Sequence, residues 1–389
     1  MVERERAGDS VLNPTTDPPK GPETPAEGSR RYRIGVVPGD GIGPEVIVEA
    51  IKVLEATGVP YELVHYDLGA ERFLRTGEVL PDSTLEEWKE LDALLLGAVG
   101  RPDVPPGILE RDLLLRARFG LDLYVNLRPV RLLDGVPSPL AGRTSHEIDF
   151  VVVRENSEGL YAGAGGALRV GAESEIAVET SLNTYLGARR CCDFAFRFAK
   201  RRNDARSASG SRKAAPNVCL VHKTNVLVWA GRLWSRAFEE AHRSCPDNAE
   251  IQKWYCHVDA ACLYMVTDPS RFDVVVTENL FGDILTDLGA AIAGGLGFAA
   301  SGNINPETRK AIFEPVHGSA PDIAGTGRAN PIAAIMSAAM LLDFVGEATA
   351  AERIDAAVRE FVKSHPVRQG GVFDLPTTKI GDIIAASVG

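Results

Sequence analysis

The stretch Arg33-Ile-Gly-Val-Val-Pro-Gly-Asp-Gly-Ile-Gly-Pro-Glu45 indicates the fold class at the point where apolar sequence begins. Its first five residues predict a buried strand, and Pro44 suits the first turn of a helix over 45–55. The glycines between them fall at 39, 41 and 43, whereas a Rossmann dinucleotide site needs G-x-G-x-x-G. The motif is either a plain tight turn or a non-Rossmann nucleotide-binding loop, and the spacing alone leaves both interpretations open.

Strand and helix alternate along the rest of the chain, which predicts an α/β fold. Apolar runs predict strands at 61–66, 93–96, 149–154, 217–222 and 272–277. Helical periodicity predicts helices at 86–90, 182–200, 229–242, 257–266, 283–293, 331–345 and 353–363. Outside these elements we expect a disordered tail over 1–30, a glycine-rich hairpin or arm over 159–171 and a surface loop over 201–215.

The chain has 389 residues, 45% hydrophobic and 24% charged, so we expect two or three domains or one large split domain. Lys and Arg number 42 against 53 Asp and Glu, a net charge of -11. An acidic surface repels phosphates, so neither nucleic acid nor an anionic membrane is an expected partner. The sequence has no apolar run of membrane-spanning length, no secretory h-region, and six cysteines typical of buried free thiols. A cytoplasmic location is therefore expected.

Three arginines stand at the edges of apolar stretches. Arg118 follows Leu113-Leu-Leu-Arg-Ala, Arg128 lies in Asn126-Leu-Arg-Pro129, and Arg154 lies in Val153-Arg-Glu-Asn156. Guanidinium groups bind carboxylates through two parallel hydrogen bonds and keep their charge. Each arginine alone is commonest as a surface ion pair, but three of them in an acidic protein favour an anion site. If they converge, they would hold a di- or tricarboxylate.

Carboxylates recur in two later segments. Asp283 and Asp287, in Phe281-Gly-Asp-Ile-Leu-Thr-Asp287, are four residues apart, so on a helix they share one face. A divalent cation such as Mg²⁺ or Mn²⁺ would relieve their repulsion, and a solvated helix N-terminus is the alternative. Asp259 adds a third carboxylate. Lys223 directly follows a strand, where it is either a solvent-facing lysine or a general base.

The densest turn segment is Glu314-Pro-Val-His-Gly-Ser-Ala-Pro-Asp322, which continues through Gly325 and Gly327 to Pro331. Backbone amides of such a loop could cradle a pyrophosphate, and the Asp322 carboxylate could accept both hydroxyls of a ribose. A purely structural loop is the alternative interpretation.

Taken together, these segments resemble the β-decarboxylating 2-hydroxyacid dehydrogenases, which include 3-isopropylmalate, isocitrate, homoisocitrate and tartrate or D-malate dehydrogenases. Six separated motifs follow the family's order over nearly the whole chain: G-D-G-I-G-P-E, N-L-R-P-V, V-R-E-N, H-K-T-N-V, N-L-F-G-D-I-L-T-D and E-P-V-H-G-S-A-P-D-I-A-G. The resemblance implies an isopropylmalate dehydrogenase-like α/β fold with a split first domain and a non-Rossmann cofactor site. It places the cofactor-side domain in 31–126 plus 297–389, and the substrate, metal and dimerisation domain in 127–296.

The resemblance also assigns roles residue by residue. The tyrosine that protonates the enol after decarboxylation corresponds to Tyr161, and the lysine base to Lys223. The substrate-carboxylate arginines correspond to Arg118, Arg128 and Arg154. The ligands of Mg²⁺ or Mn²⁺ correspond to Asp259, Asp283 and Asp287. In this family the lysine and the first aspartate come from the other subunit, which implies an obligate homodimer with shared active sites and an inter-subunit arm over 159–178.

On the cofactor side, the resemblance assigns the loop residues His317, Gly318, Ser319, Asp322, Ile323 and Asn330, with Asn225 near the nicotinamide. NADP-using relatives carry Lys and Tyr at the Asp322-Ile323 position. An aspartate there pairs with ribose hydroxyls and repels a 2′-phosphate. The resemblance therefore implies NAD.

The substrate implied most closely is (2R,3S)-3-isopropylmalate, oxidised and decarboxylated to 4-methyl-2-oxopentanoate and CO₂ in leucine biosynthesis. Isocitrate enzymes place Ser and Asn where this chain has Asp112 and Leu114, and an apolar pocket for the isopropyl group corresponds to Leu114, Leu115 and Val226.

At two positions the sequence departs from the pattern of isopropylmalate dehydrogenases, and these departures leave the choice of substrate open. The run Val153-Arg-Glu-Asn-Ser-Glu-Gly-Leu-Tyr161 is closer to the isocitrate and tartrate branches. Arg111 stands where a glutamate is usual, although a local shift of one residue would restore Glu110 to that place. The alternative is a decarboxylating D-malate or tartrate dehydrogenase, or a relative acting on another 3-substituted malate.

Overall fold

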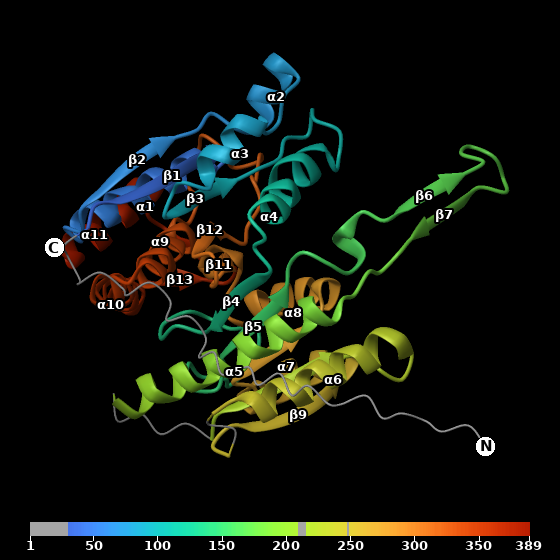
Figure 1. Cartoon of the computed structure of the whole chain (residues 1–389). Coiled ribbons are helices and arrows are strands. Elements are labelled where there is room, and N and C mark those ends of the chain that lie inside the picture. The colour runs from blue at the N-terminus through green and yellow to red at the C-terminus, as the bar shows by residue number, and fades with distance from the viewer. Residues whose placement is uncertain (1–29, 209–214, 247–248) are drawn as a thin grey trace, which may run out of the picture.

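A computed structural model describes residues 30–208, 215–246 and 249–389, so the expected tail over 1–30 lies outside the described residues except for Arg30. Its centre is a ten-stranded sheet in the order β2-β1-β3-β12-β11-β4-β5-β10-β8-β9 (Figure 1). The strands are β1 Tyr32–Gly39, β2 Tyr61–His65, β3 Ala93–Ala98, β4 Val125–Arg131, β5 Asp149–Glu155, β8 Asn217–His222, β9 Gln252–His257, β10 Val274–Thr277, β11 Ala300–Asn305 and β12 Lys310–Pro315.

The sheet consists of two parallel wings joined by an antiparallel centre. β2, β1, β3 and β12 run parallel, as do β5, β10, β8 and β9, whereas β12, β11, β4 and β5 pair antiparallel in turn. The first wing uses the two ends of the described sequence and the second uses its middle. Three antiparallel pairings separate β12 from β5, so the two wings run in opposite directions. Within each wing, the parallel strands bring carboxyl ends from distant parts of the sequence to one edge, where α/β proteins bind ligands.

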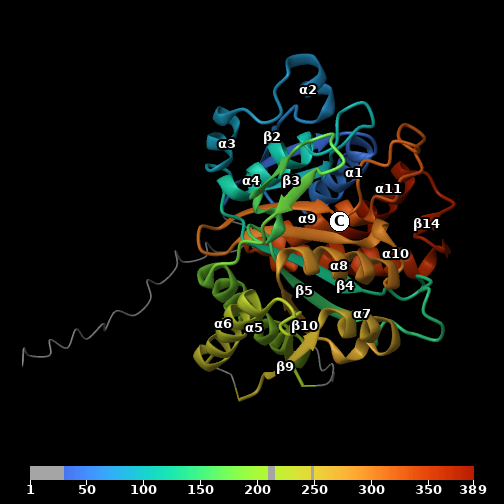
Figure 2. The ribbon, with the colours of Figure 1, turned by 90° about the vertical axis from the view of Figure 1, so that its right-hand side faces the viewer.

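Helices cover both faces of this sheet, as Figures 1 and 2 show. The helices α1, α9, α10 and α11 pack together around the first wing, and α5, α6, α7 and α8 pack with the second. Their bounds are α1 Gly43–Ala56, α2 Ala70–Thr76, α3 Asp82–Trp88, α4 Arg116–Gly120, α5 Tyr185–Ala208, α6 Val228–Ser244, α7 Val258–Thr267, α8 Asn279–Ile292, α9 Ile332–Val345, α10 Ala348–Ser364 and α11 Thr377–Val388. Within the described residues, no helix combines the length and the apolar character needed to cross a bilayer.

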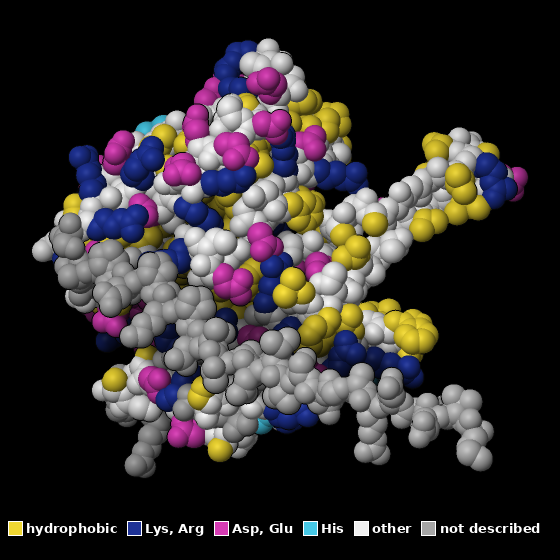
Figure 3. Space-filling view, in the orientation of Figure 1, with side chains coloured by type: hydrophobic (Ala, Val, Ile, Leu, Met, Phe, Trp, Pro, Cys, Tyr) yellow, Lys and Arg dark blue, Asp and Glu magenta, His cyan; other side chains and the backbone are white. Residues whose placement is uncertain are grey.

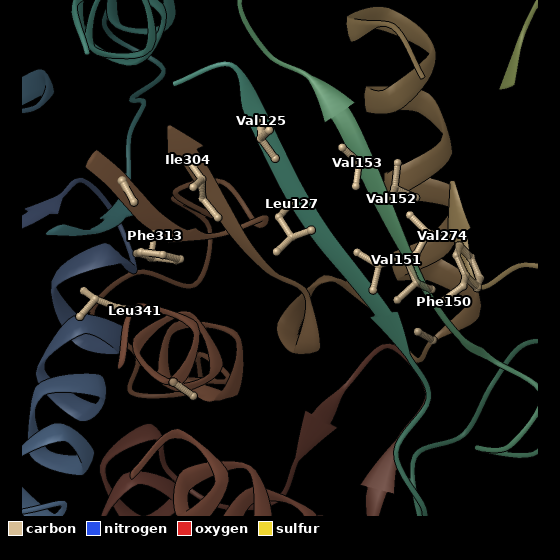
Figure 4. Packing of buried hydrophobic residues seen from close by; sticks show 14 of the residues in the cluster. Val125, Leu127, Phe150, Val151, Val152, Val153, Val274, Ile304, Phe313 and Leu341 are labelled. Atoms are coloured by element: carbon tan, nitrogen blue, oxygen red, sulfur yellow. The ribbon is translucent and has the colours of Figure 1, made fainter. Parts of the chain in front are cut away.

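One apolar core runs through both wings. Figure 4 shows Leu127 on β4, Val152 on β5 and Ile304 on β11 among its members, with Leu341 of α9 on the first-wing side. The nearly continuous apolar sequence of α9 explains its position, because ten of its fourteen residues are buried.

A two-stranded ribbon, β6 Gly165–Leu168 with β7 Ile176–Glu179, projects from the body (Figure 1). It is the hairpin or arm that the glycine-rich sequence predicts. β13 Val367–Arg368 and β14 Val372–Phe373 form a second short ribbon.

The prediction of a surface loop over 201–215 is wrong for its first half, because α5 continues to Ala208. Arg206 donates two hydrogen bonds to Asp273, at 2.7 and 2.8 Å, and Arg202 donates a third at 2.9 Å. These buried charge pairs hold the polar end of the helix against the strand that leads to β10. The remaining residues 209–214 lie outside the described residues.

Candidate active site

The candidate site lies over the antiparallel centre of the sheet, between the two wings. Arg154 of β5 is in register with Thr277 of β10, which is in turn in register with Val221 of β8. This register places Arg154, the start of α8 and Lys223 at one edge of the sheet. The first wing runs in the opposite direction, because three antiparallel pairings separate β12 from β5, so Gly39 of β1, Ala98 of β3 and the loop from Val316 lie toward the opposite edge.

Five of the predicted residues form one charged cluster. Arg154 donates a short hydrogen bond through Nη1 to Asp283 Oδ1, and Tyr161 donates its hydroxyl to Asp283 Oδ2 at 2.9 Å. The guanidinium of Arg128 lies 3.9 Å from Asp283 and 3.7 Å from Asp287. Gly282 permits this approach, because a Cβ there would come within 2.4 Å of Arg154 Cγ.

Buried amides and hydroxyls that the sequence did not single out hold these arginines in place. Arg128 donates to Asn126 Oδ1 at 2.6 Å and to Thr286 Oγ1 at 2.7 Å, and Arg154 donates to Asn279 Oδ1 at 2.9 Å. These neutral groups hold each guanidinium in addition to its carboxylate neighbours in the cluster. The signal for Asn126 was the placement of an asparagine in a strand, where it is disfavoured, whereas Asn279 and Thr286 lie in α8 and had no such signal.

Arg118 joins the cluster through the first wing. It lies 3.3 Å from Glu314 Oε1, which also accepts from Asn303 Nδ2 at 2.8 Å. Asn303 Oδ1 accepts from Asn126 and Asn156, both at 2.9 Å. A polar network therefore links all three arginines across β12, β11, β4 and β5.

The electrostatics favour anion binding by the arginines. Burial, and then the neighbouring Arg154, lower the pKa of Arg128 to about 10, which leaves it protonated at neutral pH. Burial also lowers the pKa of Arg154. Two adjacent buried cations repel each other, so an anionic ligand between them would be stabilised.

Asp283 and Asp287 have the chemistry of a hard-cation site. Burial would raise the pKa of Asp283, but attraction to Arg154 and Arg128 outweighs it and lowers that pKa. Burial and repulsion from Asp283 raise the pKa of Asp287. The two carboxylates share one face of α8, so a divalent cation between them would remove a repulsion that the fold otherwise carries.

Tyr161 is suited to donate a proton. Burial, and then the Asp283 carboxylate, raise the pKa of its phenol, so the hydroxyl stays protonated at neutral pH. Its ring lies 5.2 Å from the Arg154 guanidinium, which fixes its position beside the arginines.

Lys223 and Asp259 form a second, separate cluster. Lys223 Nζ lies 2.7 Å from Asp259 Oδ1, and hydrogen bonding to that amine lowers the pKa of Asp259. Within residues 30–208, 215–246 and 249–389, no three His, Cys, Asp or Glu side chains lie close enough to hold a metal ion. The three predicted metal ligands are therefore not brought together within one copy of the chain. Asn225 and Val226 follow Lys223 and are exposed, Val226 by 64%.

The glycine-rich turn and the predicted cofactor loop pack on each other. Ile42 N donates to Ser319 O at 2.9 Å, and Gly41, at φ +57°, approaches so closely that a Cβ would lie 2.0 Å from that oxygen. Asp322 is exposed and Ile323 half-buried beside the core. Asn330 has a structural position, because its amide donates to Gly371 O at 2.9 Å and its Oδ1 accepts from Ile332 N at 3.0 Å.

His317 has an unused acceptor on the same loop. Its Nδ1 donates to Gly318 O at 3.0 Å, its Nε2 is buried and has no partner in the part of the chain that the structure describes, and burial lowers its pKa. The neutral ring thus has one free nitrogen. It lines a cavity of about 190 Å³ together with Arg118, Arg128, Leu114 and Gly318.

A second cavity, of about 600 Å³, adjoins Tyr161 and includes Leu115, Glu110, Arg111 and Leu280. The segment Glu110–Leu115 is a π-helical turn, which takes up one more residue than an α-turn. The extra residue of this turn is the one-residue shift that would bring Glu110 to the place where a glutamate is usual. Both Glu110 and Arg111 line the cavity. Leu114 and Leu115 therefore face different parts of the site, and Val226 lines neither cavity.

His222, directly before Lys223, is a buried residue that the sequence did not single out. Its ring packs on Trp234 and edge-on against Phe281, and neither ring nitrogen has a partner among the described residues. Burial lowers its pKa to about 4. His222 therefore takes up a proton near pH 6.5 in the unfolded chain but only near pH 4 in the folded chain.

We expect His222→Phe to protect the fold against acid. Between about pH 6.5 and 4 the wild type loses stability, by about 2 kcal/mol at pH 5, and the variant lacks this loss. Denaturant midpoints of both proteins at pH 7.5 and pH 5 measure the difference, with His65→Phe on the exposed side of β2 as the control. An equal loss of stability in the wild type and His222→Phe would contradict the prediction.

The fold and the site together define a class: an α/β enzyme whose arginines and acid–base groups meet between the two wings of one sheet. The chain belongs to the isocitrate/isopropylmalate dehydrogenase family, whose model matches residues 33–380. The 3-isopropylmalate dehydrogenase of Mycobacterium avium (strain 104) is 54% identical over 357 residues, 92% of this chain and 100% of the relative. That of Thermobifida fusca (strain YX) is 52% identical over 365 residues, 92% and 98% of the two chains.

Solved structures confirm the expected fold. The isocitrate dehydrogenase from Methylococcus capsulatus has a TM-score of 0.81 at 37% identity, with 92% of this chain and 99% of that one covered. A beta-decarboxylating dehydrogenase from Thermococcus kodakarensis has a TM-score of 0.71 at 38% identity, covering 92% and 96%. The chain is therefore an oxidoreductase of this family, as the motifs predicted.

Proposed function

We propose that the protein catalyses the NAD-dependent oxidative decarboxylation of (2R,3S)-3-isopropylmalate to 4-methyl-2-oxopentanoate and CO₂, a step of leucine biosynthesis. The observation that carries the proposal is the convergence of Arg118, Arg128 and Arg154 beside apolar Leu114 and Leu115. Relatives more than half identical to this chain bear the name of that activity. A dicarboxylate with a branched apolar substituent matches both parts of the site.

The arginines bind the two carboxylates of the substrate and orient its C2. The amine of Lys223, from a second copy of the chain, takes the proton of the C2 hydroxyl as the C2 hydride leaves. The 316–330 loop would hold NAD⁺, which would supply the acceptor for that hydride. The product of this step is a 2-oxo acid that still carries its β-carboxylate.

Decarboxylation breaks the bond between C3 and the β-carboxylate, and the electron pair forms the enolate of the product. A Mg²⁺ or Mn²⁺ ion held by Asp283, Asp287 and Asp259 of a second copy would act as a Lewis acid toward the substrate oxygens. The Tyr161 hydroxyl then donates its proton to C3. Asp283, which accepts that hydroxyl's hydrogen bond, orients the proton.

If Asp283 binds the metal, Asp283→Asn should lower both the affinity for Mg²⁺ or Mn²⁺ and the rate of turnover, because the site loses one negative charge. Chelator should abolish activity and added Mg²⁺ should restore it. Titration of rate against metal concentration checks both points, with Asp268→Asn, an exposed carboxylate paired to Arg271, as the control. Full activity in excess chelator would exclude the metal.

In the cofactor site, Nε2 of His317 would accept a hydrogen bond from the adenine amine of NAD⁺. The Asp322 carboxylate would accept hydrogen bonds from the two ribose hydroxyls. We expect NAD⁺ to be preferred over NADP⁺, and Asp322→Lys to narrow that preference because a cation attracts the 2′-phosphate. Values of kcat/KM for both cofactors measure the change. Glu360→Lys, an equal charge change on exposed α10, should leave the preference intact, and a wild type that favours NADP⁺ would contradict the assignment.

The active unit that we propose is an obligate homodimer in the cytoplasm. Exposed apolar side chains support a partner surface: Leu168 and Val170 of the arm are 64% and 74% exposed, and Trp229 is 82% exposed. Figure 3 shows hydrophobic side chains gathered along the projecting arm. The separation of Lys223 and Asp259 from Asp283 and Asp287 fits sites completed by a second copy.

We also propose the domain division at 126/127 and 296/297. Every strand of the first wing comes from 31–126 or 297–389, and β4, β5, β10, β8 and β9 come from 127–296 except for the first two residues of β4. The site then lies between the domains, where ligand sites are common.

Steady-state rates with NAD⁺ test the function as a whole. We expect 3-isopropylmalate to be oxidised with a kcat/KM well above those of D-malate, tartrate and isocitrate, since only it fills the apolar pocket. A higher kcat/KM for D-malate or tartrate would instead support the alternative that the Val153–Tyr161 motif left open.

A further inference from the structure

The face of the sheet opposite the active site is also hollowed. Residues alternate between the two faces of a strand. Arg128, Asn303 and Glu314 point toward the active site, so their neighbours Leu127, Ile304 and Phe313 lie on the other face. Figure 4 shows these three apolar side chains on the adjacent strands β4, β11 and β12.

On this face a cavity of about 390 Å³ lies between α5 and α9. The strands supply its floor, and its walls include Phe194, Phe198, Met340 and Phe344. Phe194 and Phe198 are stacked, with ring centroids 5.7 Å apart, and Phe313 lies 5.7 Å from Phe344. The volume and the aromatic lining are those usual for small-molecule sites, about 300–1,000 Å³.

The mouth of this hollow carries a positive excess. Arg201 pairs with Asp343 at 3.1 Å across the gap between α5 and α9, and its guanidinium lies 4.9 Å from the Phe198 ring centroid. Arg197, one turn earlier on α5, is exposed and has no ion pair with any residue in the described ranges. Two cations against one carboxylate favour an anionic ligand group.

We infer that this hollow binds a small organic anion with an apolar body, an aryl or branched-chain carboxylate or sulfonate. The apolar body packs between the stacked phenylalanines and the strands, where burial removes apolar surface from water. The anionic group faces Arg197 at the mouth. The site is separate from the arginine–carboxylate cluster, from which the sheet divides it, and does not depend on the proposed reaction.

A fluorescent aromatic sulfonate, anilinonaphthalenesulfonate, is the probe that we would titrate into the full-length protein, with and without excess NAD⁺. We expect saturable binding of one molecule per chain that NAD⁺ does not displace. Arg197→Gln should weaken it about two- to five-fold, as expected for one partly exposed charge pair. Arg243→Gln, an exposed arginine on α6 outside the hollow, is the matched control and should bind as the wild type does.

Met340→Trp fills the hollow and should reduce probe affinity at least ten-fold, with thermal melting to show that the variant folds. If Met340→Trp does not fold, the comparison of Arg197→Gln with Arg243→Gln alone tests whether the hollow binds the probe. Both arginines are on the surface, so both of these variants should fold. Non-saturable binding, displacement by NAD⁺, or equal affinity of the two arginine variants would overturn the inference.

Discussion

Lys223→Met should slow the first turnover itself, by about 10²–10⁴-fold, which is the usual contribution of a general base. The reason is that the C2 hydroxyl must lose its proton as hydride leaves, and methionine matches the length of the aliphatic stem of lysine without its basic nitrogen. Rapid mixing of enzyme, NAD⁺ and 3-isopropylmalate, followed by NADH absorbance, resolves this step. The burst of NADH should disappear.

Two comparisons make this result specific. Lys253→Met removes a lysine of similar exposure, 30% against 26%, that pairs with Glu239 on the same wing, and it should leave the burst intact. Tyr161→Phe should lower steady-state turnover while the first burst survives, because its hydroxyl acts only after CO₂ leaves. Equal loss of the burst in Lys223→Met and Tyr161→Phe would mean that the tyrosine acts before decarboxylation or only positions the substrate.

The sequence predicted Arg154, Asp283 and Lys223 because each stands at or shortly after the end of an apolar strand. Arg154 lies near the end of β5, Asp283 lies in α8 after β10 and Lys223 directly follows β8, and parallel strands bring such ends to one edge. Spacing alone, however, could not predict which atoms meet. The bond from Asn126 to Asn303 joins residues 177 apart and depends on β11 lying beside β4.

Two other features could not be predicted from local sequence patterns, because each depends on a residue far along the chain. The end of α5 is polar and turn-rich, and it is helical because Asp273, far along the chain, satisfies Arg202 and Arg206. The π-helical turn at Glu110 also depends on packing, since Leu113 must be buried while Arg118 reaches Glu314. Local propensity carries no information on either partner.

Mixing two inactive variants should restore activity if the sites are shared. We expect Lys223→Met and Asp283→Asn homodimers each to be nearly inactive. In a hybrid, the intact Asp283 of the first chain meets the intact Lys223 of the second, so one complete site forms and the other is doubly defective. Random re-pairing of equal amounts gives hybrids in about half of the dimers, each with one working site of two, hence about a quarter of wild-type activity.

The measurement is the rate of NADH formation after the two variants are unfolded and refolded together, with each variant refolded alone as the control. Recovery requires that Lys223 act in the site that contains Asp283 of the other copy. If both residues served the same chain's site, every hybrid site would carry one substitution and no activity would return. The separation of the Lys223–Asp259 pair from the Arg154–Asp283–Tyr161 cluster within one copy is the physical reason to expect recovery.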